Sequence, residues 1–199
     1  MVDAVILLDI DGVCLNWEKG LVNYMEQHLP HVADAGVFDE HAFDLAPRYG
    51  ISSSEANQLV WDFHHHRGFA ELEPMPGATQ AIEMLRKVGK LVAITACGTT
   101  DRVQHMRQEN LKSCFGNVFS EIYCTNNFEE KRGYLKNYPP GFWVEDHIKN
   151  AITGAECGHK SYLISALHNQ KDWHPLVTRV KDLCQAADLI LEQLHTKCH

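Results

Sequence analysis

The chain has 199 residues, of which 45% are hydrophobic and 22% are charged, as is ordinary for a globular protein. Its formal charge of −8 at pH 7 argues against a protein that tracks the phosphate backbone of a nucleic acid, whereas a small anion held through a metal ion stays compatible. No apolar run approaches the roughly 20 residues that span a bilayer, and the N-terminal residues lack the pattern of a secretory signal. We therefore expect a cytoplasmic protein, in which the seven cysteines, without any Cys-x-x-Cys pair, are reduced thiols.

Apolar runs alternate with helical patterns along most of the chain. The first run, Val5 to Leu8, is continuous, which is typical of a buried strand in a parallel sheet. Strands that alternate with helices predict an α/β fold, a Rossmann-like parallel sheet with helices on both faces. The further predicted strands are 91–95, 118–124, 142–145 and 161–164, and the predicted helices between and after them are 78–88, 102–111, 131–137, 148–155 and 182–194.

A helical segment separates the first strand from the rest of this pattern. Trp17 to Leu29 has a helical pattern that ends at a proline, and 31–51 combines loop with short helix. Ser52 and Glu55 have the spacing of a capping box and precede apolar residues at helical intervals. The length of the chain suits one domain with a small insertion. The predicted parts are an α/β core, 1–15 and 76–199, and an inserted helical cap, 16–75.

Two acidic residues, Asp9 and Asp11, follow the first strand directly, and Gly12 comes after them. Chemistry in parallel α/β sheets gathers outside the carboxyl ends of the strands. On an extended chain the two carboxylates share a face, while Gly12 lets the backbone turn sharply and approach a ligand. This arrangement suits a hard cation and a phosphate, although an Asp-Gly turn after a strand explains these residues alone equally well.

Groups suited to binding a phosphate follow the next two predicted strands. Thr95 and Ala96 supply a hydroxyl and backbone N–H groups at the end of the strand 91–95. Lys131 begins a helix after the strand 118–124 and supplies a cation for a phosphate oxygen.

A second acidic pair, Glu145 and Asp146, ends the strand 142–145 and is suited to completing a Mg²⁺ shell with Asp9. Each of these residues at a strand end, taken alone, usually serves the fold and has no role in catalysis or binding. Together, at the carboxyl ends of neighbouring strands, they predict one site for a phosphate and a magnesium ion.

In this order the four motifs resemble those of the haloacid dehalogenase superfamily of phosphatases, over nearly the whole chain. The resemblance implies that Asp9 is the nucleophile, Asp11 the general acid/base, and Thr95 and Lys131 the phosphate anchors. It also implies Mg²⁺ as the cofactor. The implied metal ligands are Asp9, Asp11, Asp146 and Glu145.

A narrower resemblance, to the 5′(3′)-deoxyribonucleotidases, rests on the segments 9–18, 68–78 and 168–170. Those enzymes carry a small helical cap in the same place and hydrolyse nucleoside monophosphates. The chain departs from them in two ways. Ala96 stands where they usually have serine, and no arginine comes just before Lys131.

Aromatic residues of the predicted cap are candidates for choosing the substrate. Trp17, Phe43 and Phe69 could each stack on a nucleobase, an interaction worth about 1–3 kcal/mol. Packing inside the cap explains Trp17 and Phe69 equally well, and it is the favoured interpretation for Trp61. The run 64–66 of three histidines is expected on a solvated helix face, because consecutive helical residues point in different directions.

The sequence thus predicts a Mg²⁺-dependent phosphatase that cleaves small phosphate monoesters through an aspartyl phosphate, with nucleoside monophosphates favoured. A phosphatase of sugar phosphates or other small metabolites is the alternative. A binding or regulatory protein without turnover is a third hypothesis, disfavoured because Asp9 and Asp11 are both present. The expected partner is a small phosphorylated metabolite, with no polynucleotide and no membrane. The sequence leaves the oligomeric state open, a homodimer included.

Overall fold

The architecture is a parallel sheet of six strands, seen in a computed structural model that describes residues 4–126 and 130–196. The strand order is β3-β2-β1-β4-β5-β6, so the first strand lies in the middle of the sheet. The predicted α/β fold with a Rossmann-like sheet is therefore confirmed. The strands are β1 (Ala4–Leu8), β2 (Gly89–Thr95), β3 (Phe119–Cys124), β4 (Phe142–Glu145), β5 (Lys160–Ile164) and β6 (Val177–Val180).

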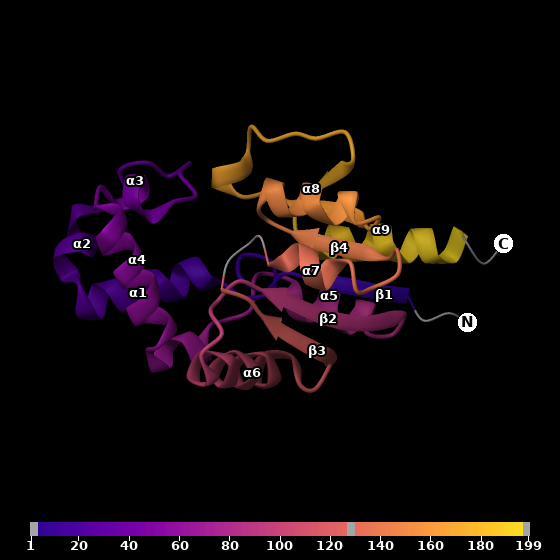
Figure 1. Cartoon of the computed structure of the whole chain (residues 1–199), viewed down its shortest axis with the longest axis horizontal. Helices are drawn as coiled ribbons and strands as arrows, with labels where there is room; N and C mark the ends of the chain where they lie inside the picture. Colours follow the sequence, from indigo (N-terminus) through magenta and orange to yellow (C-terminus); the bar gives the residue numbers. More distant parts are fainter. Residues whose placement is uncertain (1–3, 127–129, 197–199) are drawn as a thin grey trace.

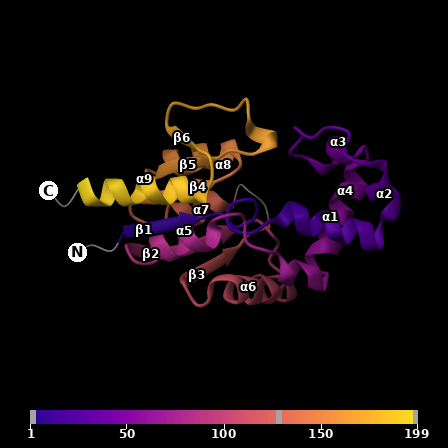
Figure 2. The same cartoon turned by 180° about the vertical axis from the view of Figure 1, so that it is seen from behind.

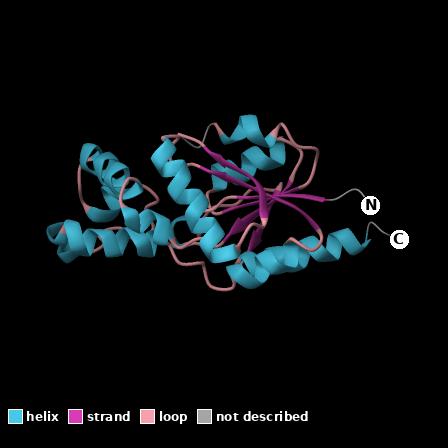
Figure 3. Ribbon diagram, turned by 90° about the horizontal axis from the view of Figure 1, so that it is seen from below, coloured by secondary structure: helices cyan, strands magenta, loops and turns pink. Residues whose placement is uncertain are grey.

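Helices cover both faces of this sheet (Figure 3). One face packs against α5 (Ala78–Leu85), α6 (Asp101–Phe115) and α9 (Leu183–Thr196), and the other against α7 (Lys131–Leu135) and α8 (Ile148–Glu156). These five helices lie within a few residues of the predicted ranges.

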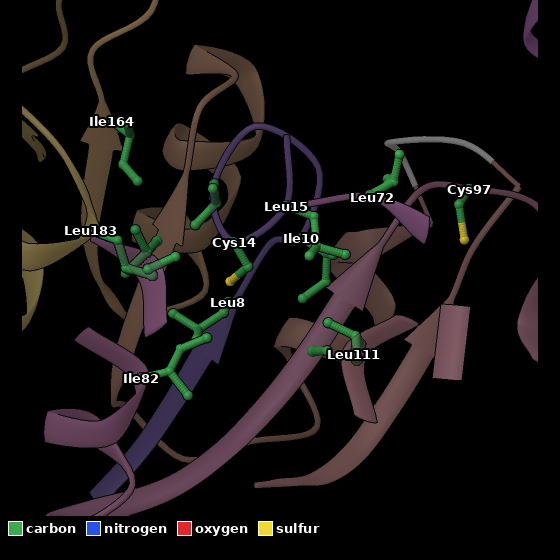
Figure 4. Close-up of a cluster of buried hydrophobic side chains, with 14 of the residues drawn as sticks. Leu8, Ile10, Cys14, Leu15, Leu72, Ile82, Cys97, Leu111, Ile164 and Leu183 are labelled. Carbon is green, nitrogen blue, oxygen red and sulfur yellow. The ribbon is translucent and has the colours of Figure 1, made fainter. Parts of the chain in front are cut away.

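The side chains of β1 alternate between the two faces. Ile6 and Leu8 belong to the larger apolar cluster, part of which is drawn in Figure 4, and Leu7 to a smaller cluster with Leu135 and Trp143. A strand buried on both faces needs no polar position, which explains its continuous apolar run.

The helices between β1 and α5 gather beside the sheet, next to the carboxyl ends of its strands (Figures 1 and 2). The predicted capping box is confirmed, since the Glu55 N–H donates to Ser52 Oγ and the Ser52 N–H donates to the Glu55 carboxylate. The boundaries of a separate cap at 16 and 75 remain a prediction. These helices are α1 (Trp17–His28), α2 (Pro30–Ala35), α3 (Leu45–Tyr49), α4 (Ser53–His64) and the short 3₁₀ helix η1 (Arg67–Glu71).

Two expectations for α4 are wrong. Its buried face carries Leu59, Phe63 and His64, so His64 does not lie on a solvated face. Trp61 is 56% exposed and packs on His65 instead of filling the core. Helical residues two apart point to different sides, so Trp61 cannot share the stripe that 59 and 63 define.

The strand β6 was not predicted. Its two middle residues, Thr178 and Arg179, are exposed, and it forms an edge of the sheet beside β5. Such a short edge strand carries too few apolar residues to be recognised without its partner. Among the described residues, no helix is long and apolar enough to cross a membrane.

Candidate active site

The loop after β1 winds around a single carbonyl group. The backbone N–H groups of residues 13–15 all donate to the Ile10 carbonyl oxygen, over 2.8–3.3 Å. Gly12 has a φ of +80°, and a Cβ atom at this position would lie 2.2 Å from Asp146 Oδ2. Glycine is therefore needed both for the turn and for the close approach of Asp146.

The loop brings Asp9 into a group of three carboxylates. Oxygen atoms of Asp9, Glu145 and Asp146 lie within 4.8 Å of one another. Lys131 Nζ lies 2.8 Å from Asp9 Oδ1 and 3.0 Å from Glu145 Oε2, and its side chain is buried. Three ionised carboxylates and one ammonium leave two negative charges uncompensated. An all-oxygen donor set with this charge fits a divalent cation such as Mg²⁺.

The pKa values of these groups reflect their burial and the shortage of positive charge around them. Burial, and then the neighbouring Glu145, raise the pKa of Asp9 well above its usual range. Burial and the charge of Asp9 raise the pKa of Asp146 to about 7. Burial opposes the charge on Lys131, but Asp9 and Glu145 outweigh it and raise the pKa of this ammonium. A cation bound among the carboxylates would favour their ionised forms.

Asp146 is held in place through its backbone. Asn169 Nδ2 donates to the Asp146 carbonyl at 2.6 Å and to the Ile164 carbonyl at 2.8 Å, and a ring nitrogen of His168 lies 3.0 Å from the Asp146 carbonyl. Arg179 in turn donates to Asn169 Oδ1 at 2.8 Å. His168 and Asn169, from the segment 168–170 noted for its resemblance to the deoxyribonucleotidases, thus hold the loop after β4.

Asp11 takes partners different from those of Asp9. Arg107 Nη2 lies 2.6 and 2.7 Å from the two Asp11 carboxylate oxygens. Among the residues that the structure describes, Asp11 does not belong to the group of carboxylates whose oxygen atoms lie within 4.8 Å of one another. Asp9 and Asp11 therefore do not project from one extended segment as expected, because the backbone turns after Ile10.

The end of β2 reaches Asp11 as well. Thr95 is fully buried, and its Oγ1 donates to Asp11 Oδ2 at 3.3 Å. Because a hydroxyl has one proton, donation to a phosphate would require Thr95 to exchange this hydrogen bond. Ala96, the other predicted phosphate contact at this strand end, is half-buried.

Arg107 is the site residue that the sequence analysis missed. It lies on the buried stripe of α6, at helical spacing from Val103 and Leu111, and its side chain has no exposed surface. Burial opposes the charge on its guanidinium, but Asp11 and nearby thiols raise its pKa. An arginine in the apolar stripe of an amphipathic helix is the signal that could have revealed it, because charged residues are almost never fully buried unless paired.

Phe69 is completely buried and lies against the guanidinium of Arg107. The Arg107 Cζ atom lies 4.2 Å from the Phe69 ring centroid, and the His64 ring packs 4.6 Å away. The structure therefore places Phe69 in packing, and stacking on a nucleobase would require it to lose these contacts.

Trp17 is half-buried and fixes the state of His64. The indole of Trp17 only donates, so at 2.9 Å from His64 Nε2 it requires that nitrogen to accept. His64 Nδ1 then carries the proton and donates to the Cys97 carbonyl at 2.8 Å. Burial lowers the pKa of His64 to about 4, so the ring is neutral at pH 7.

Phe43 lies where the helical segment meets the sheet edge. Its ring is 4.5 Å from the His147 ring and 5.1 Å from the His168 ring, between centroids, and 38% of the residue is exposed. Nearby, His41 Nδ1 lies 3.1 Å from the Leu167 carbonyl oxygen. These contacts place Phe43 at the rim of the charged group, beside the residue that follows Asp146.

Comparison with known sequences gives partial matches. No protein-family model matches the chain. It is 26% identical over 162 residues to an uncharacterized 32.4 kDa protein of Enterobacteria phage T4, a match that covers 80% of this chain and 57% of the relative. It is 30% identical over 81 residues to the mitochondrial 5′(3′)-deoxyribonucleotidase of Homo sapiens, covering 39% of this chain and 35% of that enzyme. The chain thus spans little more than half of the phage relative and about a third of the human one.

Comparison with solved structures covers almost the whole chain. A haloacid dehalogenase-like family hydrolase, SP0104 from Streptococcus pneumoniae, matches with a TM-score of 0.67 at 18% identity, over 98% of both chains. The magnesium-bound hydrolase YfnB from Bacillus subtilis matches with a TM-score of 0.63 at 11% identity, over 95% of this chain and 99% of that one. The chain therefore has the fold of the haloacid dehalogenase-like hydrolases, and the resemblance seen in its motifs is confirmed at this level.

Proposed function

We propose that the chain is a Mg²⁺-dependent phosphatase that hydrolyses small phosphate monoesters through an aspartyl phosphate on Asp9. The observation that carries this proposal is the buried group of Asp9, Glu145 and Asp146 with Lys131, which leaves two negative charges at the carboxyl edge of a haloacid dehalogenase-like sheet. The magnesium named for YfnB, and the magnesium and phosphate named for the heptose bisphosphate phosphatase of B. bronchiseptica, support the assignment.

The residues that would hold the metal are Asp9, Asp146 and Glu145. Asp11, a fourth predicted ligand, would contribute through its side chain only after leaving Arg107. When bound, Mg²⁺ supplies positive charge that offsets the negative charge of the phosphate and the three carboxylates.

The chemistry of the protein side chains follows from their positions. A carboxylate oxygen of Asp9 attacks phosphorus, the bond to the leaving oxygen breaks, and Asp11, which must be protonated at this stage, gives that oxygen its proton. Asp11 then takes a proton from a water molecule, whose oxygen attacks the phosphorus and releases inorganic phosphate from Asp9. Lys131, 2.8 Å from Asp9, stays charged and offsets the charge that develops during both transfers.

Nucleoside monophosphates are the substrates we propose first. The support is the sequence similarity to deoxyribonucleotidases, together with Phe43, a partly exposed aromatic residue at the rim of the site. The burial of Phe69 favours the alternative, sugar phosphates or other small metabolites, because it removes one of the aromatic faces predicted to hold a base.

A panel of phosphate monoesters tests both the phosphatase activity and the preference for nucleoside monophosphates. We expect hydrolysis of nitrophenyl phosphate that needs Mg²⁺, stops with EDTA and is inhibited by beryllium fluoride, a mimic of aspartyl phosphate. Among natural esters, nucleoside monophosphates should have the highest kcat/KM. Preference for sugar phosphates would replace the nucleotidase assignment by its alternative. Absence of hydrolysis of every ester, or turnover unaffected by EDTA, would contradict the phosphatase.

A further inference from the structure

We infer that Arg107 is a positioning residue that holds the Asp11 carboxylate for proton transfer, with Phe69 as the platform for its guanidinium. The inference rests on the proposed function, in which Asp11 is the general acid/base. It assigns roles in the reaction to two residues that do not touch the phosphate.

The contacts define the orientation of Asp11. Arg107 Nη2 reaches both carboxylate oxygens, at 2.6 and 2.7 Å, and Thr95 Oγ1 adds a contact to Oδ2 at 3.3 Å. Hydrogen bonds between ionised groups are about twice as strong as neutral ones. With both oxygens held, the carboxylate cannot rotate freely.

Burial makes this pair persistent. The Arg107 side chain is fully buried, whereas that of Asp11 is 20% exposed. An exposed ion pair contributes little to stability, whereas removing one partner of a buried pair leaves an uncompensated buried charge and is strongly destabilising. Separation from Asp11 would leave the buried guanidinium of Arg107 without its partner, so the ion pair stays formed. The exposed part of Asp11 is the part that a leaving group or a water molecule can reach.

Phe69 fixes the guanidinium from the other side. Its ring centroid lies 4.2 Å from Arg107 Cζ and is itself packed edge-on by Phe63 at 5.9 Å. Stacking of arginine on an aromatic face restricts the plane of the guanidinium. Since Phe69 belongs to η1 and Arg107 to α6, two elements that pack together, the end of the helical segment supports the acid/base.

The two aspartates of the first motif thus have cations from opposite faces of the sheet. Lys131 begins α7 and contacts Asp9, while Arg107 comes from α6 and contacts Asp11. This arrangement keeps Asp11 out of the carboxylate group that would hold the metal. It reserves Asp11 for proton transfer.

The test compares leaving groups in Arg107→Ala, with Arg102→Ala, an exposed arginine of the same helix, as the matched control. Alkoxides need a proton to depart and nitrophenolate does not, so loss of a positioned acid slows alkyl phosphates selectively. In single turnovers with Mg²⁺ we expect Arg107→Ala to lose about 100-fold on glycerol phosphate and less than about 10-fold on nitrophenyl phosphate. Added guanidinium should restore part of the alkyl activity, and Arg102→Ala should match the wild type.

A double-mutant cycle separates positioning from a merely structural role. If Arg107 acts through Asp11, then Arg107→Ala should change the ratio of alkyl to aryl rates by less than about 2-fold when Asp11→Asn is already present. Equal losses on both esters in Arg107→Ala, or an undiminished selective loss in the Asp11→Asn background, would overturn the inference.

Phe69→Leu keeps the test informative if Arg107→Ala does not fold, because it preserves an apolar side chain in the core. We expect a smaller loss, about 3–10-fold, again confined to the alkyl ester. Equal losses on the two esters would contradict the platform role. A wild type inactive on both esters would contradict the proposed function and with it this inference, whereas an active wild type whose variants keep the same ester ratio would contradict the inference alone.

Discussion

Asp9 and Asp11 stand two residues apart in the chain but belong to two differently charged regions. Asp9 lies with Glu145 and Asp146, and the ammonium of Lys131 pairs with Asp9 and Glu145. Asp11 has Arg107 as its own buried partner, one charge against one. The first region keeps a surplus of negative charge, whereas the second is balanced.

The difference shows how one short motif can support two chemical roles. Burial, and after it the neighbouring carboxylates, raise the pKa of Asp9 and Asp146, and this group of carboxylates creates a demand for a cation near the proposed nucleophile. A balanced pair makes no such demand and holds one carboxylate in a defined orientation. In the proposed reaction, Asp9 needs a bound cation beside it, whereas Asp11 needs a fixed orientation toward the leaving oxygen.

The largest effect is expected from Asp9→Asn, which removes the nucleophile and one charge from the surplus region. Hydrolysis of nitrophenyl phosphate should fall by about 1,000-fold or more, because an amide does not form the aspartyl phosphate. Initial rates with Mg²⁺ measure it, with the exposed Asp188→Asn as the control. Full activity of Asp9→Asn would rule out the covalent mechanism.

Gly12→Ala should disturb the surplus region without removing a charge. The new Cβ would meet Asp146 Oδ2 at 2.2 Å, so this carboxylate must move from its place beside the loop. We expect the Mg²⁺ concentration for half-maximal activity to rise by about 100-fold, at the upper end of losses seen when a ligand's support is disturbed.

The matched control for Gly12→Ala is Gly36→Ala. Gly36 also has a positive φ, +75°, but a Cβ there meets nothing within 4 Å. Both variants strain the backbone, but only the new Cβ of Gly12→Ala meets Asp146. Only Gly12→Ala should therefore change the Mg²⁺ requirement. An equal requirement in the two variants would show that Asp146 does not bind the metal.

Aromatic residues of the helical segment should affect which substrate the enzyme prefers, and they should leave the chemistry of both charged regions unchanged. If Trp17 or Phe43 stacks on the base, its replacement by alanine should lower kcat/KM for a nucleoside monophosphate by roughly 10–100-fold, while nitrophenyl phosphate loses far less. Trp61→Ala, on the exposed face of α4, is the control. Equal losses on both esters would remove that residue from base recognition.

The smallest effect concerns His64, which lies buried near the balanced pair. Its pKa, lowered to about 4 by burial, is below its ordinary value of 6.5, and Asp11 and Arg107 act on it in opposite directions. The unfolded chain therefore takes up a proton before the folded one as the pH falls. The free energy of unfolding should decrease by about 1 kcal/mol per pH unit between about pH 6.5 and 4, and no such contribution should exist above that range.

Urea unfolding at several pH values measures this dependence. His64→Gln, which can still accept from Trp17 and donate to the Cys97 carbonyl, should reduce this slope by about 1 kcal/mol per pH unit. The part due to His147, whose pKa burial also lowers to about 4, should remain, and His105→Gln, at an exposed position, should keep the whole slope. An unchanged decrease in His64→Gln would assign it to other groups.

Most strands and helices were predictable because their signals are local. The strand 142–145 is β4 to the residue, and Ser52 with Glu55 marks the start of α4. Where the signal is weak the prediction failed, as for β6, which becomes a strand only through pairing with β5. The exposure of Trp61 was also missed, although its position two residues before Phe63 places it outside the stripe that Leu59 and Phe63 define.

The sequence by itself determined the order of strands and helices and the acidic, hydroxyl and lysine residues at the strand ends. Apolar period, caps and strand-end position are properties of short segments, and a parallel sheet brings its carboxyl ends to one edge. Only the tertiary structure decided that Asp11 joins Arg107, 96 positions away, and that Phe69 packs on the guanidinium of this arginine. These pairings depend on which helix crosses which strand end, since a buried charge is stable only where the fold places its partner.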